Sequence, residues 1–428
     1  NIPSVKLPFK LDFNKYVAGQ KYDNLKKLNL HNEDRDPSMM RSKIISDFLI
    51  EQGVPAPRVA YTRNTINGEY WGLYTVVEQL DKTFLSTNFS LNSGNLYKAL
   101  PRYPGWEPLG GSTLEYLGFL PSDYDDIYEL KTNETLNDWS GFVNLLNEIN
   151  NTSATEFKDS LEAVLNTDSF LKAWAIMALF VNYDAYPFLG NNYYLYENPV
   201  DGKFQWIAWD FNLGVGTARR GMTIPQAETV SVLFLPVGSG PRPLATRMLD
   251  NVYYYNRYLS WLCQFTQTSF DTTLLFPKID SIADLIRTDL YADPNKFYGN
   301  LAFEESMDYN IFGFPGLKPF IAHRRAAVLE ELETLGCPVV SVESATAQSI
   351  KVVVYPNPFS DFATIELQEP KDLWTWTLYN ALGQTVQHFD EISGQRLIIE
   401  KGDLTSGIYF YQVWTKNRLA VAGKLAIE

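Results

Sequence analysis

The stretch 206-WIAWDFNLGVG-216 places an aspartate inside an apolar run that ends in two glycines. The apolar residues before Asp210 are typical of a buried strand, and Gly214 and Gly216 indicate a tight turn after it. A carboxylate at such a strand end can cap the turn by hydrogen-bonding its own backbone, or it can hold a metal ion. The stretch alone leaves both interpretations open.

The segments before this stretch are predicted to form a helix and a hairpin. Residues 168–181 have a polar first turn and a long apolar body, which predicts a helix that ends at 182-NYD-184. Two strand-like runs, 192–197 and 204–210, flank a turn at Asp201-Gly202 and predict a hairpin. The helix end and the open end of the hairpin are therefore expected to meet.

This arrangement brings two aspartates and an asparagine to one edge of the hairpin. Asp184, Asn192 and Asp210 are the candidates, with Asn191 as an alternative to Asn192. Oxygen ligands of this kind suit Mg²⁺, Mn²⁺ or Ca²⁺ and do not suit zinc. A loop Asp, a following Asn and a strand-end Asp also match the parts of protein-kinase phosphoryl transfer. Each residue can equally be an ordinary turn residue.

The N-terminal part has an order of elements that fits the same chemistry. A helix is expected over 38–52, followed by a hairpin around Asn67-Gly68 whose second strand ends in 76-VVEQLDKTFL-85. In a kinase-like fold this order gives a helix, two strands and the segment that carries the adenine. Glu78 to Leu80 would then offer backbone groups to the base, and the alternative for Glu78 is a solvated strand end.

The ordered motifs across residues 1 to about 336 resemble the CotH kinase family. This resemblance implies an α+β, atypical protein-kinase-like two-lobed domain that phosphorylates Ser or Thr of secreted proteins with ATP and a divalent metal, Mg²⁺ or Mn²⁺, with Ca²⁺ also allowed. The matching pieces are 36-DPSMMRSKIISDFL-49, 53-GVPAPR-58, 66-INGEYWGLYTVVEQLDKTFL-85, 94-GNLYK-98, 182-NYD-184, 192-NYYLY-196, 209-WDFNLGVG-216 and 317-LKPFIAHR-324.

The resemblance implies a role for each matching residue. Asp184 would be catalytic, because it orients the acceptor hydroxyl and can accept its proton. Asp210 would bind the metal, and Asn192 would be a second metal ligand. Arg41 would reach the phosphates of ATP or pair with an acid. Glu78 would lie in the adenine-binding segment.

Some features depart from the family's pattern and keep a second hypothesis open. A second Asp often follows the first by two residues, and this chain has Asn212 there. No G-x-G-x-x-G loop is present near the N-terminus, and Lys10, Lys26 and Lys27 are equal candidates for the phosphate-binding lysine. The alternative is a catalytically inactive surface protein that binds a partner protein or a glycan, with 102-RYPGWEPLGG-111 as an aromatic platform.

The chain changes character after residue 338. Residues 339–350 are predicted to be a linker, and the short strand-like runs over 351–428 predict a small all-β, Ig-like sandwich. These runs resemble the type A sorting domain of type IX secretion. The resemblance implies contact with that secretion machinery, a secreted or outer-surface location, and a signal peptide removed upstream of residue 1. The matching pieces are 354-VYPNPFSD-361, 379-YNALGQTV-386, 406-SGIYFYQV-413 and 423-GKLAIE-428.

Composition excludes several other classes of protein. The net charge of −14 argues against nucleic-acid binding, which needs a basic face. No run of about 18 apolar residues is present, so no transmembrane segment is expected. Three histidines far apart in the chain argue against a histidine-rich metal site and a His-based hydrolase triad. Cys263 and Cys337 can pair, although nothing in their spacing demands it.

Overall fold

The computed structural model divides into two compact units, Asn1–Val339 and Val340–Glu428. The predicted linker 339–350 and all but the last residue of the aromatic segment 102–111 lie outside the described residues. The structure describes residues 5–101, 111–219, 221–236, 240–337, 352–367, 373–380, 385–402, 404–415 and 418–428.

The first unit begins with a four-stranded antiparallel sheet in the order β1-β2-β4-β3. The predicted turn between β3 and β4 is present, with φ of 53° at Asn67 and 86° at Gly68, as a two-residue Asn-Gly hairpin turn requires. Helix α1 (Arg41–Glu51) packs beside β3, and its Phe48 makes edge-on ring contacts with Phe180 and Phe270. The strands are β1 (Phe9–Asp12), β2 (Lys27–His31), β3 (Val59–Ile66) and β4 (Glu69–Val77).

The two faces of this sheet carry different side chains. Lys10 of β1 pairs with Asn29 of β2, which pairs with Val77 of β4, so these residues share one face. Alternate residues project to the other face, which includes Leu28 and Val76. The register therefore separates the β1 lysine from the apolar residues of the opposite face.

A second antiparallel sheet, in the order β6-β5-β7-β8, forms the middle of the same unit. Strand β8 is buried along its whole length, and β7 is buried except at its last residue. Strands that are covered on both faces consist mostly of apolar residues, and 204–208 does so except at Gln205. The predicted 192–210 hairpin is confirmed. The strands are β5 (Leu96–Ala99), β6 (Tyr128–Leu130), β7 (Tyr193–Glu197) and β8 (Phe204–Ala208).

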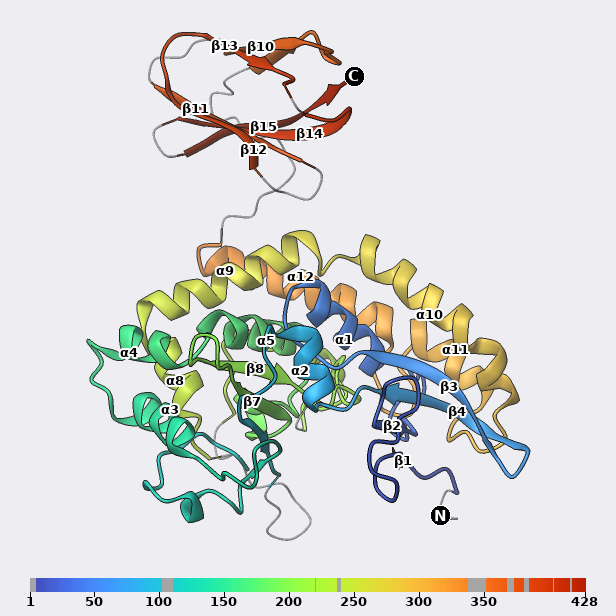
Figure 1. The fold of residues 1–428 in the computed structure, drawn as a ribbon. Coiled ribbons are helices and arrows are strands. Elements are labelled where there is room, and N and C mark those ends of the chain that lie inside the picture. Colours follow the sequence, from blue (N-terminus) through green and yellow to red (C-terminus); the bar gives the residue numbers. More distant parts are fainter. Residues whose placement is uncertain are drawn as a thin grey trace. The chain divides into compact units, whose positions relative to one another are not determined.

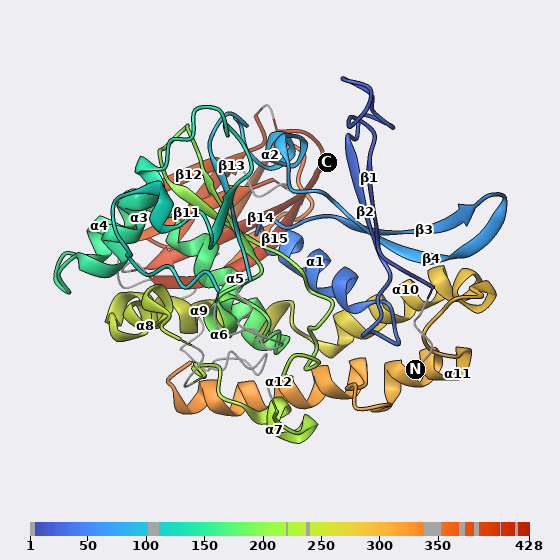
Figure 2. The same ribbon diagram turned by 90° about the horizontal axis from the view of Figure 1, so that it is seen from below.

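Helices surround this second sheet, and the predicted helix over 168–181 is α5 (Thr167–Leu179), which contacts β8. Figures 1 and 2 show the long helices α9, α10 and α12 lying along one side of the unit. In the part of the chain that the structure describes, no helix is long and apolar enough to cross a membrane. The other helices are α2 (Lys82–Asn88), η1 (Pro121–Asp123), α3 (Ser140–Asn151), α4 (Phe157–Val164), α6 (Tyr186–Leu189), α7 (Ile224–Thr229), α8 (Pro243–Asp250), α9 (Val252–Thr268), α10 (Thr272–Ala292), α11 (Asn300–Asp308) and α12 (Leu317–Thr334).

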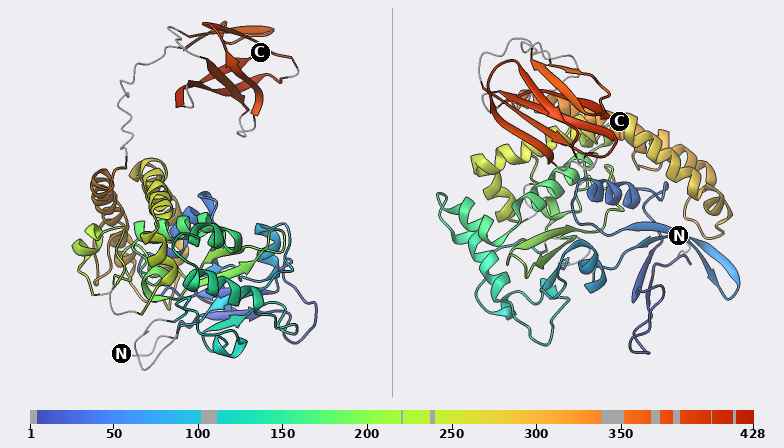
Figure 3. Two further views of the ribbon diagram at one scale, coloured as in Figure 1. Left: turned by 90° about the vertical axis from the view of Figure 1, so that its left-hand side faces the viewer. Right: turned by 45° about the horizontal axis from the view of Figure 1, so that its top comes forward.

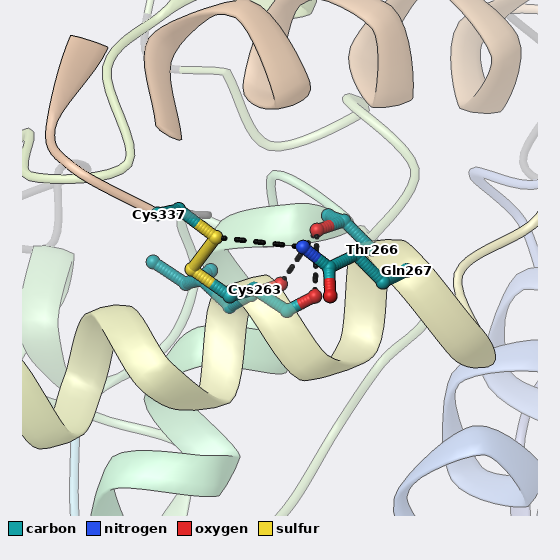
Figure 4. The surroundings of a disulfide bond; sticks show 5 residues. Cys263, Thr266, Gln267 and Cys337 are labelled. Atoms are coloured by element: carbon teal, nitrogen blue, oxygen red, sulfur yellow. Dashed lines mark hydrogen bonds between the residues drawn. A yellow bond between two sulfur atoms is a disulfide. The ribbon is translucent and has the colours of Figure 1, made fainter. Parts of the chain in front are cut away.

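The two cysteines form a disulfide bond, which the sequence left open. Cys263 of α9 joins Cys337, which follows α12, across 74 residues of sequence (Figure 4). The bond ties the end of the last helical segment to α9. Such bonds form and persist in oxidising compartments outside the cytosol.

The second unit is all-β and contains two antiparallel sheets, β13-β10-β9 and β12-β11-β14-β15 (Figure 3). Its core includes Ile365, Trp374, Trp376 and Ile399. Strand β12 was not predicted from the sequence, because its residues are mostly polar and exposed and form no apolar run. The strands are β9 (Val352–Tyr355), β10 (Phe362–Leu367), β11 (Trp374–Tyr379), β12 (Thr385–Ile392), β13 (Arg396–Glu400), β14 (Gly407–Thr415) and β15 (Arg418–Ile427).

The structure confirms the α+β class and the all-β C-terminal unit. The finer expectation, a two-lobed kinase-like arrangement of the first unit, stays a prediction.

Candidate functional site

The open end of the β7–β8 hairpin places Asn192 beside Trp209, the residue before Asp210. The backbone N–H of Trp209 donates to the carbonyl of Asn192 at 3.1 Å. Asn192 and Asp210 both have left-handed backbone, with φ of 57° and 60°. Residues other than glycine adopt this conformation at a cost, and such strain gathers at functional positions.

The two glycines after Asp210 allow close packing against helices. A Cβ atom at Gly214 would lie 2.0 Å from Cδ1 of Ile45 in α1. A Cβ atom at Gly216, where φ is +69°, would lie 2.3 Å from the Phe320 ring of α12. The glycines therefore let the segment after Asp210 pack between α1 and α12, which fixes where the Asp210 carboxylate can lie.

Asp184 is held by the amides of its two asparagine neighbours. Nδ2 of Asn192 donates to the Asp184 carboxylate at 2.9 Å and to the Asp184 carbonyl at 2.7 Å. Nδ2 of Asn191 donates to the other carboxylate oxygen at 3.2 Å. We call Asp184, Asn191, Asn192 and Asp210 the carboxylate site. Three of these residues were predicted to converge, and the fourth was the predicted alternative.

The carboxylate site brings two like charges close together. Burial raises the pKa of Asp184 to about 6; the charge of Asp210 adds to this, and the amides of Asn191 and Asn192 and the charge of Arg35 oppose it. Burial also raises the pKa of Asp210, against the backbone N–H of Asn212 and the charge of Lys98. Two buried carboxylates, each with a raised pKa, are stabilised in their ionised form by a bound cation.

The donor atoms of the carboxylate site fit a hard divalent cation. Oδ1 of Asn191 is buried without a hydrogen-bond partner among the described residues, as is Oδ1 of the nearby Asn182, whose amide donates to the Asp210 carbonyl at 3.5 Å. Carboxylate and amide oxygens are the ligands that Mg²⁺ and Mn²⁺ prefer. The carboxylate site contains two carboxylates, those of Asp184 and Asp210. In the described ranges, no group of three or more His, Cys, Asp or Glu residues could hold a metal ion.

Arg41 lies elsewhere, in a buried ion pair. Its guanidinium pairs with Asp36, and its Nη2 donates to the Pro315 carbonyl at 2.6 Å. Both side chains of the pair are 0% exposed. Of the two predicted roles, pairing with an acid is the one observed, and no exposed edge of Arg41 remains for a nucleotide.

Glu78 pairs with Arg58 at 2.6 Å, and its backbone N–H donates to the Arg58 carbonyl. Both residues line a pocket of about 320 Å³ with Leu28, Ala60 and Val76. Those three residues project from the sheet face opposite Lys10. Most of the pocket therefore lies on the face opposite Lys10, although Lys27, from the Lys10 face, also lines it. Base binding by residues 78–80 stays a prediction.

Two charged residues that interact with the carboxylate site were not predicted from the sequence. Glu33 is 2% exposed, accepts from Ser42 at 3.2 Å, and its Oε2 has no partner within the described chain. Burial and the charges of Asp36 and Asp210 raise its pKa to about 8. Lys98 of β5 acts on Asp210 through its charge. A single Glu or Lys beside a strand carries no sequence signal, because its neighbours come from distant segments.

Comparisons with known proteins agree with this architecture. Residues 3–328 match the family described as CotH kinase protein, and residues 353–428 match the secretion system C-terminal sorting domain. The sorting-domain match is consistent with a secreted or cell-surface location.

Two known proteins are similar in sequence to the first unit. Inner spore coat protein H of Bacillus subtilis (strain 168) is 26% identical over 271 residues, which cover 63% of this chain and 70% of that protein. Invasin CotH2 of Rhizopus delemar is 21% identical over 310 residues, covering 66% of this chain and 50% of that protein. The alignment thus spans only half of the invasin.

A solved structure, Pseudomonas fluorescens alkylpurine DNA glycosylase AlkC bound to DNA containing an abasic site analog, aligns at 14% identity over 72% of this chain and 85% of that chain. Its TM-score of 0.15 is too low to indicate a shared fold. The family match, in contrast, extends over most of the first unit and includes every residue of the carboxylate site. The chain belongs to the CotH kinase protein family and ends in a secretion sorting domain.

Proposed function

We propose that this protein is a secreted protein kinase that transfers the γ-phosphate of ATP to Ser or Thr of an extracellular or surface protein, and that it needs Mg²⁺ or Mn²⁺. The observation that carries the proposal is the convergence of Asp184, Asn192 and Asp210, which supplies the two acids and the amide that such a transfer uses. Membership of the CotH kinase protein family supports the same activity.

In this proposal Asp184 positions the acceptor hydroxyl. Its pKa of about 6 leaves the carboxylate mostly ionised at neutral pH, so it can accept a proton. As the hydroxyl oxygen bonds to the γ-phosphorus, the bond from that phosphorus to the ADP oxygen breaks, and Asp184 takes the hydroxyl proton. Asn191 and Asn192 hold the Asp184 carboxylate in place.

Asp210 would hold the cation together with an amide oxygen of the neighbouring asparagines. A bound Mg²⁺ or Mn²⁺ would neutralise the phosphate charge during the transfer. Asn212 stands where a further acid is frequent in the family, and its backbone N–H already supports the Asp210 carboxylate. With Asn212 in that position, Asp210 is the carboxylate that would hold the cation.

Calorimetric titration of the full chain with ATP and Mg²⁺ or Mn²⁺ tests the proposal. We expect metal-dependent ATP binding that weakens at least 100-fold in Asp210→Asn, because the amide removes the main anionic ligand and keeps the shape. Asp201→Asn, in the turn at the far end of the β7–β8 hairpin, is the matched control and should bind as the wild type does.

The pH dependence gives a second check on the same site. Protonation of Asp184 below about pH 6 should weaken metal-dependent ATP binding, and an Asp184→Asn variant should lose this part of the pH profile. A wild-type chain that binds ATP with neither metal between pH 6 and 8 would sink the proposed kinase activity.

A further inference from the structure

Two turns of the first unit share one backbone conformation but differ in their residues. Phe312 and Gly313, between α11 and α12, form a turn whose flanking residues exchange backbone hydrogen bonds of 3.0 and 2.7 Å. Their φ angles are 49° and 82°, and those of Asn67 and Gly68 in the β3–β4 turn are 53° and 86°. Such a turn needs positive φ at both central residues, which asparagine and glycine tolerate better than a bulky side chain does. Phenylalanine thus occupies a position that favours asparagine.

Burial does not compensate for this strain. The Phe312 side chain is 75% exposed. Its ring stacks on Tyr298, with centroids 6.1 Å apart and planes at 22°, and Tyr298 makes an edge-on contact with Phe314 at 5.9 Å. We call Tyr298, Phe312 and Phe314 the aromatic surface. Folding alone does not explain a ring that is both strained and exposed, and such residues gather where proteins bind other molecules.

The aromatic surface is joined to the segment that follows Asp210. Nη2 of Arg219 donates to the carbonyl of Gly313 at 2.9 Å, and Nη1 donates to the carbonyl of Gly216 at 3.2 Å. Gly216 belongs to the glycine turn that fixes the position of the Asp210 carboxylate. One arginine therefore connects the Phe312 turn with the turn after Asp210.

The same segment also contacts the residue before Asp184. The backbone N–H of Tyr183 donates to the carbonyl of Ala218, next to Arg219, at 3.1 Å. The aromatic surface and both carboxylates are thus attached to residues 216–219. Because an extended peptide covers about 3.3 Å per residue, a segment that presents a hydroxyl to Asp184 can reach the aromatic surface a few residues away.

The polar groups of the aromatic surface already have partners within the protein. The Tyr298 hydroxyl donates to the carbonyl of Asp34 at 2.8 Å, and the Gly313 carbonyl accepts from Arg219. The surface therefore presents ring faces to a ligand. This favours an apolar or aromatic side chain over a sugar, because the hydroxyls of a buried sugar also need hydrogen-bond partners.

We propose that the aromatic surface docks the acceptor protein, and that the acceptor has an apolar or aromatic side chain close to the Ser or Thr that receives the phosphate. The inference rests on the proposed kinase function and specifies the class of its substrate. Phe312 would be the main contact, because its ring is the most exposed of the three.

The test measures binding and phosphorylation of short peptides by the full chain and three variants. Each peptide has one central serine in a background of glycine and glutamine, with or without one leucine or phenylalanine on either side of the serine. Phe312→Asn removes the ring and gives the turn its favoured residue, and Phe312→Trp keeps an aromatic ring. Phe119→Asn is the matched control, because Phe119 is also 75% exposed and lies on the loop before η1.

We expect the wild type to bind and phosphorylate a peptide with leucine or phenylalanine about 10-fold better than the peptide without one. Phe312→Asn should lose this preference, and its ATP affinity should stay within about 3-fold of the wild type. Its midpoint of thermal unfolding should rise by about 1–3 °C, since the strain is relieved. Phe312→Trp and Phe119→Asn should keep the preference. A purely structural role of Phe312 predicts the opposite change in unfolding temperature.

The outcomes separate this inference from the proposed function. A wild type that binds ATP but shows no preference among the peptides overturns the docking surface and leaves the kinase proposal standing. The same holds if Phe312→Asn keeps the preference or unfolds at a lower temperature. Peptide binding through Phe312 without ATP binding overturns both the kinase proposal and the assignment to an acceptor.

The neutral oligosaccharide cellohexaose is a further probe of the aromatic surface. Binding of cellohexaose that Phe312→Asn abolishes, in a chain that binds none of the peptides, would overturn the assignment to a protein and favour a glycan. Binding of the peptides without binding of cellohexaose would support the proposal.

Discussion

The first unit contains two groups of charged residues away from solvent, one made of opposite charges and the other of like charges. At the start of α1, Asp36 and Arg41 are both fully buried, and the opposite charges neutralise each other. At the end of the β7–β8 hairpin, Asp184 and Asp210 lie close together, and burial, with the like charge of Asp210, raises the pKa of Asp184. In both groups an aspartate stands next to an apolar helix or strand, so the two groups look alike in the sequence.

The difference between the two groups is whether the protein completes the site. Asp36 also accepts from the backbone N–H groups of Ser38 and Arg41, at 2.9 and 2.8 Å, so the protein alone satisfies its carboxylate. The carboxylate site keeps a buried amide oxygen of Asn191 without a partner in the described chain. A carboxylate that the protein itself neutralises stabilises the fold, whereas like charges without a counter-charge indicate a ligand.

The largest expected effect comes from breaking the complete pair. Arg41→Met leaves the Asp36 carboxylate buried without its counter-charge, near Glu33, and should cost about 3–5 kcal/mol of unfolding free energy. Urea denaturation of the full chain measures this cost. The double variant Asp36→Asn with Arg41→Met should recover part of it, and a loss below about 1 kcal/mol in the single variant would contradict the comparison.

An intermediate effect is expected at Glu33, whose pKa is raised by burial and by the charges of Asp36 and Asp210, one from each group. Its pKa of about 8 in the folded protein is above the usual value near 4.5, so the folded state keeps a proton that the unfolded chain releases. The unfolding free energy should therefore fall as the pH rises from about 4.5 to about 8. Glu33→Gln removes this ionisation and can still accept from Ser42.

We expect Glu33→Gln to be more stable than the wild type at pH 9, by about 2–4 kcal/mol, since each pKa unit corresponds to about 1.4 kcal/mol. The two should differ little at pH 4.5. Denaturation curves in the presence of a chelator measure both values without bound metal. A stability difference that does not change with pH would show that Glu33 ionises as an ordinary surface acid does.

The smallest effect is expected at the exposed ion pair of the first sheet. Arg58 is 61% exposed, and solvent screens its pairing with Glu78. Arg58→Met should cost at most about 1 kcal/mol of unfolding free energy, and the ATP affinity should not change, because Arg58 is not part of the carboxylate site. A clear loss of ATP affinity in the calorimetric titration would instead place the nucleotide base beside this pair.

Local patterns were enough to predict many elements of the fold. The Asn67-Gly68 turn, the β7–β8 hairpin and α5 each follow from residues adjacent in sequence, because turn conformation and apolar periodicity are local properties. Strand β12 was missed for the same reason, since its polar residues give no such pattern.

The candidate site was predictable only where it follows from the ends of those elements. Asn192 and Asp210 could be placed together because a hairpin brings its own two ends side by side, and Asp184 because the end of the preceding helix was expected to meet them. The disulfide between Cys263 and Cys337 joins segments far apart in the chain, and the burial of the Asp36–Arg41 pair requires contacts with distant residues such as Pro315.

Residue order thus specified the elements, their turns and the acids at their ends, since each depends on a few neighbouring residues. The environment of each charge required the packed chain. Burial, the nearest counter-charge and the face of a sheet arise from contacts between distant segments. The aspartate of 206-WIAWDFNLGVG-216 illustrates both parts. The strand, the turn and the nearness of Asp184 were evident from the sequence, whereas the charges of Glu33 and Lys98 interact with Asp210 only in the folded chain.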